Sequence, residues 1–140
     1  MNKKNLIIAL LLAVVLGVSG VWYFIFYRPR LPRDITNEDA VSVTSKQIVK
    51  EFQTNEAEAY KKYPTSKVVE ITGEIAECGK DQSGHPTVSI KSDDPFSNVF
   101  ITLRQSKQLE AKVGTKITVR GIVTGFLSDV LINEGVVTKQ

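Results

Sequence analysis

The chain has 140 residues, of which 42% are hydrophobic and 24% are charged, and its formal net charge at pH 7 is +3. Five basic residues before position 34 account for that excess, because the remainder carries 13 basic and 15 acidic residues. The net charge of −2 over residues 34–140 disfavours nucleic-acid binding that depends on neutralising phosphates. The single cysteine, Cys78, excludes an internal disulfide and is expected to be buried near the end of a strand.

The first predicted element is a helix over residues 6–27, after a short tail of residues 1–5. This run holds no charged residue and no proline. A helix of that length rises about 33 Å and can cross a hydrocarbon core of ~30 Å, so it predicts a single-pass membrane anchor. A cleaved signal peptide is the alternative, because two lysines precede the run and Val18-Ser19-Gly20 resembles a cleavage site. Hydrophobicity that continues past Gly20 favours the uncleaved anchor.

The two ends of this run bear on its interface and its orientation. Aromatic rings followed by a cation are typical of a membrane–water interface, and here they are Trp22, Tyr23, Tyr27 and Arg28. Basic residues flank both ends, so the positive-inside rule leaves the orientation open, whereas the signal-like start favours a periplasmic domain. Small residues at every fourth position favour close approach of two helices and hence a homodimer. These residues are Ala9, Ala13 and Gly17.

A juxtamembrane linker is predicted over residues 28–43, because two prolines and mixed charges do not continue a helix. A helix packed on the following domain is predicted over residues 44–63, with Thr44 and Gln47 as its capping box. Asn55 repeats the cap pattern, so either one bent helix or two short helices are expected. The apolar stripe of this segment comprises Ile48, Phe52, Ala59 and Tyr63.

A period of two begins near residue 67 and is typical of half-buried strands. Five strands are predicted within residues 67–138, with a short helix or turn over residues 104–112. The strands cover residues 68–77, 87–91, 98–103, 114–123 and 130–137. Gly73 and Gly121 occupy matching places in the first and fourth strands and let strongly bent strands close on themselves. The pattern predicts a mainly β fold, a small five-stranded Greek-key OB-fold barrel preceded by an α-helix, with a flat five-stranded sheet as the alternative.

Three segments of this domain resemble the tRNA_anti-like family of OB-fold proteins. They are NEAEAYKKYPTSKVVEITGEI, VGTKITVRGIVTGF and DVLINEGVV, and the resemblance spans about residues 34–139. It implies an OB-fold at the bacterial cell envelope, where many members follow a membrane anchor or a lipoprotein signal. The family's motifs are structural, so no catalytic residue is transferred. Its name suggests nucleic-acid binding only by analogy of fold.

No pattern in the sequence predicts catalysis. The one histidine, His85, lies in a predicted turn without other ligands or a nucleophile at suitable spacing. The adjacent acids Asp93 and Asp94 precede a proline and are typical of a turn. We therefore expect no enzyme activity, no metal site and no cofactor.

A binding face is predicted on the second and third strands, where OB-folds usually hold their ligands. Its candidate residues are Lys91, Phe100, Thr102, Arg104 and Arg120. Single-stranded nucleic acid requires several stacking aromatics and a basic groove, and only Phe96 and Phe100 are available here. The sequence therefore favours a protein, peptide or glycan at the cell envelope over a tRNA or single-stranded nucleic acid.

Overall fold

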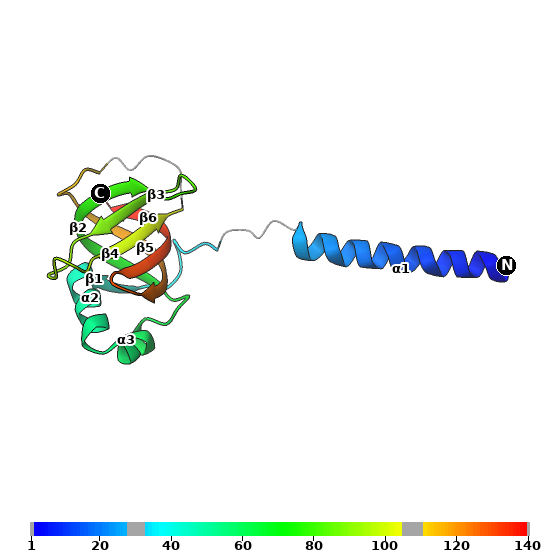
Figure 1. Cartoon of the computed structure of the whole chain (residues 1–140), viewed down its shortest axis with the longest axis horizontal. Coiled ribbons are helices and arrows are strands. Elements are labelled where there is room, and N and C mark those ends of the chain that lie inside the picture. Colours follow the sequence, from blue (N-terminus) through cyan, green and yellow to red (C-terminus); the bar gives the residue numbers. More distant parts are fainter. Residues whose placement is uncertain (1, 28–32, 105–110, 140) are drawn as a thin grey trace. The chain divides into compact units, whose positions relative to one another are not determined.

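A computed structural model of the chain describes residues 2–27, 33–104 and 111–139, and the chain divides into two compact units. The first unit, Met1–Arg33, contains the helix α1 (Lys3–Phe26). The second unit, Asp34–Gln140, contains the remaining helices and strands (Figure 1).

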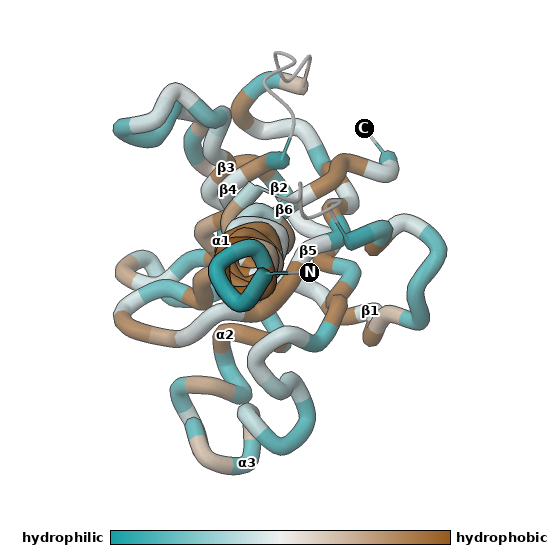
Figure 2. The backbone as a smooth tube through the Cα atoms, turned by 90° about the vertical axis from the view of Figure 1, so that its right-hand side faces the viewer, coloured by the Kyte–Doolittle hydropathy of each residue, from teal (hydrophilic) through white to brown (hydrophobic). Residues whose placement is uncertain are grey.

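Helix α1 is apolar on all sides, and none of its side chains is buried. Figure 2 shows its tube as hydrophobic beyond a hydrophilic start. It begins three residues before the predicted position, because Lys3 and Lys4 are good helix formers and extend it. Within the described residues, α1 alone is long and apolar enough to cross a membrane, a property that a signal sequence shares. At its end, the rings of Tyr23 and Tyr27 stack with centroids 5.9 Å apart, whereas Arg28 lies outside the described residues.

The second unit is built on a closed five-stranded barrel, which confirms the predicted fold and excludes the flat sheet. Its strands are β2 (Val68–Lys80), β3 (Pro86–Ile90), β4 (Val99–Leu103), β5 (Lys116–Phe126) and β6 (Val130–Lys139). They pair in the order β2-β3-β4-β6-β5, and antiparallel pairing of β2 with β5 closes the barrel. Strands β4 and β6 run parallel, and the other barrel pairs are antiparallel.

The barrel interior is filled by the side chains that alternate along each strand, as the sequence pattern predicts. These buried residues include Ile71, Ile75, Val88, Ile90, Val99, Ile101, Ile117, Val119, Val123 and Ile132. The two matched glycines are sites of close approach. A Cβ at Gly73 would lie 2.3 Å from the Ser45 hydroxyl oxygen, and one at Gly121 would lie 2.3 Å from a methyl group of Ile132.

Two short helices, α2 (Ser45–Thr54) and α3 (Glu56–Lys62), cover one end of the barrel (Figure 1). Both predicted caps are confirmed, because the side chains of Thr44 and Asn55 each accept a backbone N–H three residues ahead at 3.2 Å. The helices pack through Phe52, whose ring centroid lies 5.1 Å from that of Tyr60 and 5.4 Å from that of Phe126. This aromatic cluster joins both helices to the end of β5.

Part of the predicted linker is folded. Residues 41–43 were expected in the linker over residues 28–43, but they belong to strand β1 (Val41–Thr44). This strand pairs in parallel with β2, from Val41 opposite Val69 onward, along a stretch of β2 that β3 does not reach. The contact is invisible to local pattern analysis because the partner strand lies almost 30 residues away. Upstream of β1, the side chain of Ile35 is fully buried.

Three further predictions need correction or fall outside the described residues. Strand β2 continues through residues 78–80, so Cys78 lies inside the strand, past its predicted end at residue 77, and is exposed rather than buried. The predicted helix or turn over residues 104–112 lies mostly outside the described residues. Strand β5 begins at Lys116 rather than Gly114, which has φ +90° in the preceding turn and therefore suits glycine.

Candidate functional site

The centre of the candidate site is Phe100 on β4. Its neighbours Val99 and Ile101 fill the core, so the alternation of the strand directs Phe100 outward. It lies opposite Ser89 of β3 on one side and opposite Leu131 of β6 on the other, and all three are partly exposed. Phe100 and Leu131 thus form an apolar pair beside a hydroxyl group.

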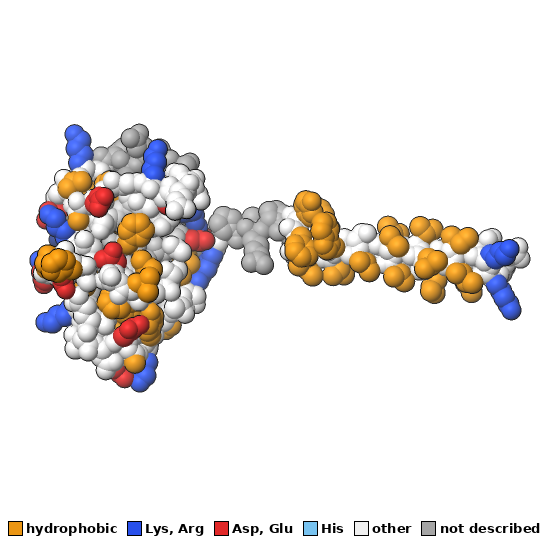
Figure 3. Space-filling view, viewed as in Figure 1, with side chains coloured by type: hydrophobic (Ala, Val, Ile, Leu, Met, Phe, Trp, Pro, Cys, Tyr) orange, Lys and Arg blue, Asp and Glu red, His pale blue; other side chains and the backbone are white. Residues whose placement is uncertain are grey.

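Thr102 extends the same outward row of β4 and lies opposite Thr87 of β3. We define the binding face as the outward side chains of β3, β4 and β6 at this place, together with the basic residues that directly follow β3 and β4. They are Ser89, Lys91, Phe100, Thr102, Arg104 and Leu131. Figure 3 shows hydrophobic side chains in a line over the side of the molecule where β4 and the β5–β6 hairpin lie.

The tip of the β5–β6 hairpin adds Leu127, whose relative exposure is 81%. The hairpin is fixed against the start of β4, because a carboxylate oxygen of Asp129 accepts the Asn98 N–H at 2.8 Å. The Val130 N–H in turn donates to the Asn98 carbonyl at 3.0 Å. The β5–β6 loop of this barrel corresponds to a loop that flanks the ligand in OB-folds.

The two cations of the binding face are both ion-paired. The Lys91 Nζ lies 3.0 Å from a Glu74 carboxylate oxygen, and the Arg104 guanidinium pairs with Glu134. Each pair is partly solvated, so it neutralises charge without adding much stability. The described part of this face therefore presents an apolar and hydroxyl-bearing surface with balanced charge.

Arg120, the fifth predicted residue, lies elsewhere. It projects from β5, where its Nη atoms donate to the carbonyl oxygens of Thr36 and Glu38, the second at 2.8 Å. Its Nε lies 3.4 Å from a Glu70 carboxylate oxygen. The structure thus brings Phe100, Thr102 and Arg104 together and places Arg120 on the segment that precedes β1.

Sequence reasoning missed three residues near this site, Ser89, Leu127 and Leu131. Leu131 is placed beside Phe100 by a parallel pairing that no local pattern reveals. The exposure of Leu127 could have been predicted from the sequence. This leucine precedes Ser128 and Asp129 between two predicted strands, so no strand or helix buries it.

Further titratable side chains lie in the loop between β2 and β3 and, with the thiol of Cys78, near the end of β2. His85 Nδ1 lies 3.3 Å from Asp81, and the backbone N–H groups of His85 and Ser83 lower the pKa of the Asp81 carboxyl. Partial desolvation and the Glu77 carboxylate raise the pKa of Cys78. In the described ranges, no three His, Cys, Asp or Glu side chains gather as a metal site would require.

A closed barrel of five strands, with its third and fifth strands paired in parallel, defines an OB-fold. The chain belongs to the tRNA_anti-like family, whose model matches residues 1–135. No curated protein matches it. A similar solved structure is the crystal structure of yeast Stn1 and Ten1, with 15% sequence identity and a TM-score of 0.46. The match covers 74% of this chain and 65% of that chain, so this chain spans less than two thirds of its length.

Proposed function

We propose that this chain is a membrane-anchored OB-fold module whose binding face takes a protein, peptide or glycan at the bacterial cell envelope. The observation that carries the proposal is the pair Phe100–Leu131, an apolar centre bordered by the hydroxyl groups of Ser89 and Thr102. Such a surface suits an uncharged stretch of polymer, which can lie on the ring and hydrogen bond to the hydroxyls. The proposed role is binding without catalysis.

The ion pairs of the binding face favour an uncharged ligand over a polyanion. Lys91 and Arg104 are already paired with Glu74 and Glu134, so a polyanion would have to compete with carboxylates for both cations. Counterion release, which drives phosphate binding, needs cations that are free to contact the backbone.

A binding experiment tests the proposed ligand class. The full chain in lipid nanodiscs is applied to a glycan array and a peptide array, together with the variants Phe100→Ser and Val113→Ser. Val113 is a matched control, because it is also exposed, at 60%, but lies in the turn before β5. We expect hits that weaken about tenfold in Phe100→Ser and are unchanged in Val113→Ser. Arrays without a hit that depends on Phe100 would contradict the proposal.

The proposed topology places α1 in the membrane and the barrel in the periplasm. Cys78 is exposed and is the only cysteine of the chain, so it reports the side directly. A membrane-impermeant maleimide should label intact cells that express the chain and should not label a Cys78→Ser control. Because the pKa of this thiol is raised, labelling is expected to accelerate as the pH is increased. Labelling only after lysis would place the barrel in the cytoplasm.

Single-stranded nucleic acid is the second candidate, favoured by the use that OB-folds make of the corresponding face. It predicts binding of a 15-mer oligo-dT or oligo-U to the full chain, weakening steeply with salt and depending on Phe100. Binding of this kind together with a cytoplasmic barrel would replace the first proposal. No binding at low salt would remove the second.

A further inference from the structure

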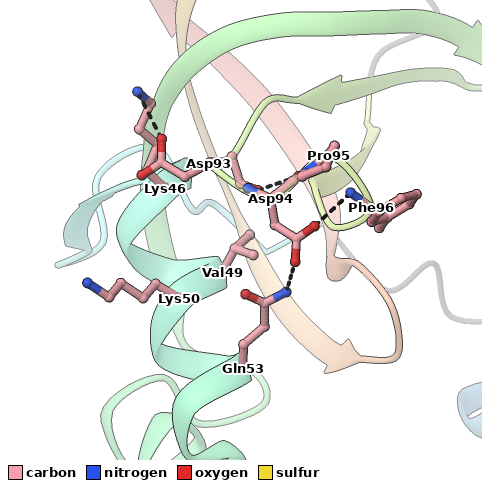
Figure 4. Close-up of a pocket in the computed structure, with 9 residues that line it drawn as sticks. Lys46, Val49, Lys50, Gln53, Asp93, Asp94, Pro95 and Phe96 are labelled. Atoms are coloured by element: carbon pink, nitrogen blue, oxygen red, sulfur yellow. Dashed lines mark hydrogen bonds and ion pairs between the residues drawn. The ribbon is translucent and has the colours of Figure 1, made fainter.

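A groove lies between α2 and the loop that joins β3 to β4 (Figure 4). Its volume is about 480 Å³, within the range of sites that hold small ligands or side chains. The buried side chain of Val49 forms its floor, and Pro95 and Phe96 form the wall on the loop side. Phe96 has a relative exposure of 87%, the highest among the large hydrophobic side chains described.

The exposure of Phe96 is not a consequence of a loose loop. The Gln53 side-chain amide donates to Asp94 at 2.7 Å, and the same carboxylate accepts the Phe96 N–H at 2.8 Å. A second bridge joins Lys46 of α2 to Asp93 at 3.2 Å. These contacts between the two walls fix the shape of the groove. Binding of a ligand would therefore require little further ordering of the loop.

Two lysines line the groove, and one of them is already in an ion pair. Asp93 is paired with Lys46, and the two oxygens of Asp94 accept the bonds from Gln53 and Phe96. Among the described residues, the Lys50 ammonium has no hydrogen-bond or ion-pair partner. In Figure 4, Lys50 and Phe96 lie on opposite sides of Val49. A ligand across the groove would thus meet an apolar ring at one end and a cation at the other.

We propose that this groove is a second interaction site, which binds a peptide segment with an acidic residue close to an aromatic or aliphatic side chain. The apolar side chain covers Val49 and packs on Phe96, and the carboxylate pairs with Lys50. The unpaired cation selects this occupant over a basic peptide. The site shares no residue with the binding face, and its lining residue Ser92 directly follows Lys91 of that face.

Selection from a displayed library of random dodecapeptides tests the proposal. The full chain in lipid nanodiscs is the bait, and empty nanodiscs of the same lipid remove peptides that bind the bilayer. We expect enriched peptides to share an Asp or Glu near an aromatic or aliphatic residue. Their affinity should fall about tenfold in Phe96→Ser and in Lys50→Glu, and remain unchanged in Val113→Ser.

A charge exchange provides the sharper readout. Replacing the acidic residue of an enriched peptide by lysine should restore its binding to Lys50→Glu and weaken its binding to the unaltered chain. Lys50→Gln, which removes the charge without reversing it, should give intermediate affinity for the acidic peptide.

Three results would overturn this site. They are no enrichment over empty nanodiscs, equal affinity for Phe96→Ser, or no recovery on charge exchange. Peptides that lose affinity in Phe100→Ser but not in Phe96→Ser would overturn the groove site while supporting the proposed function.

Discussion

The barrel has two outer surfaces with cations, and they differ in what lies on them. On the surface formed by β2 and β5, which we call the covered face, Arg120 pairs with Glu70 and donates to two carbonyl groups of the segment of residues 34–40. On the binding face, the Arg104 guanidinium pairs with Glu134 of the neighbouring strand β6, and Phe100 stays partly exposed. An arginine on an outer surface of a barrel therefore indicates a ligand only where the chain itself does not occupy that surface.

The largest expected effect concerns the core that both faces share. Phe52→Ala removes the ring that joins α2 and α3 to Phe126 and should lower the free energy of unfolding by about 3–5 kcal/mol. Urea unfolding of the second unit, followed by circular dichroism on the full chain in micelles, measures it. A single transition is expected, and separate unfolding of residues 34–44 would contradict their packing on the barrel through β1 and Ile35.

Removal of the arginine on the covered face should have the next largest effect. Arg120→Ala leaves two carbonyl groups and Glu70 without their donor and should cost about 2–3 kcal/mol. Hydrogen exchange should show lost protection around Ile35 and β1, with ligand binding unchanged. Loss of ligand binding at undiminished stability would instead make Arg120 a ligand residue.

A pH experiment tests the packing of α2 and α3 at the end of the barrel, separately from the covered face and the binding face. Burial, and next the Glu51 carboxylate, raise the pKa of the Tyr63 phenol to about 12 from 10.0. The neutral phenol therefore stabilises the fold fully below pH 10, and this contribution is lost as the pH rises from 10 to 12, by about 2 kcal/mol. Tyr63→Phe should lack that extra decline when urea unfolding is compared between pH 9 and 12. Parallel declines in both proteins would argue against a raised pKa.

The smallest expected effect is that of the arginine on the binding face. Arg104→Ala removes a partly solvated ion pair and should change the free energy of unfolding by less than about 1 kcal/mol. The same urea titration that is used for Arg120→Ala measures this difference. A cost equal to that of Arg120→Ala would show that the two faces are equally structural.

The sequence was sufficient for most of the barrel, because strands with one buried side carry a period-two pattern and Gly73 and Gly121 mark close approaches. Both helix caps followed from local chemistry at Thr44 and Asn55. Strand β1 could not be predicted, because VSVT is short and its pairing depends on the free edge of β2. Arg120 was misplaced for the same kind of reason, since its partners Thr36 and Glu38 lie more than 80 residues upstream.

Chemical-shift mapping tests the central claim that the ligand binds to the binding face of the barrel and not to the covered face. The isotopically labelled full chain in nanodiscs is titrated with the ligands that the arrays identify. We predict that the amide signals of Ser89, Phe100, Thr102 and Leu131 shift with the ligand, while those of Thr36 and Arg120 do not. Shifts confined to Thr36, Glu70 and Arg120 would contradict the account.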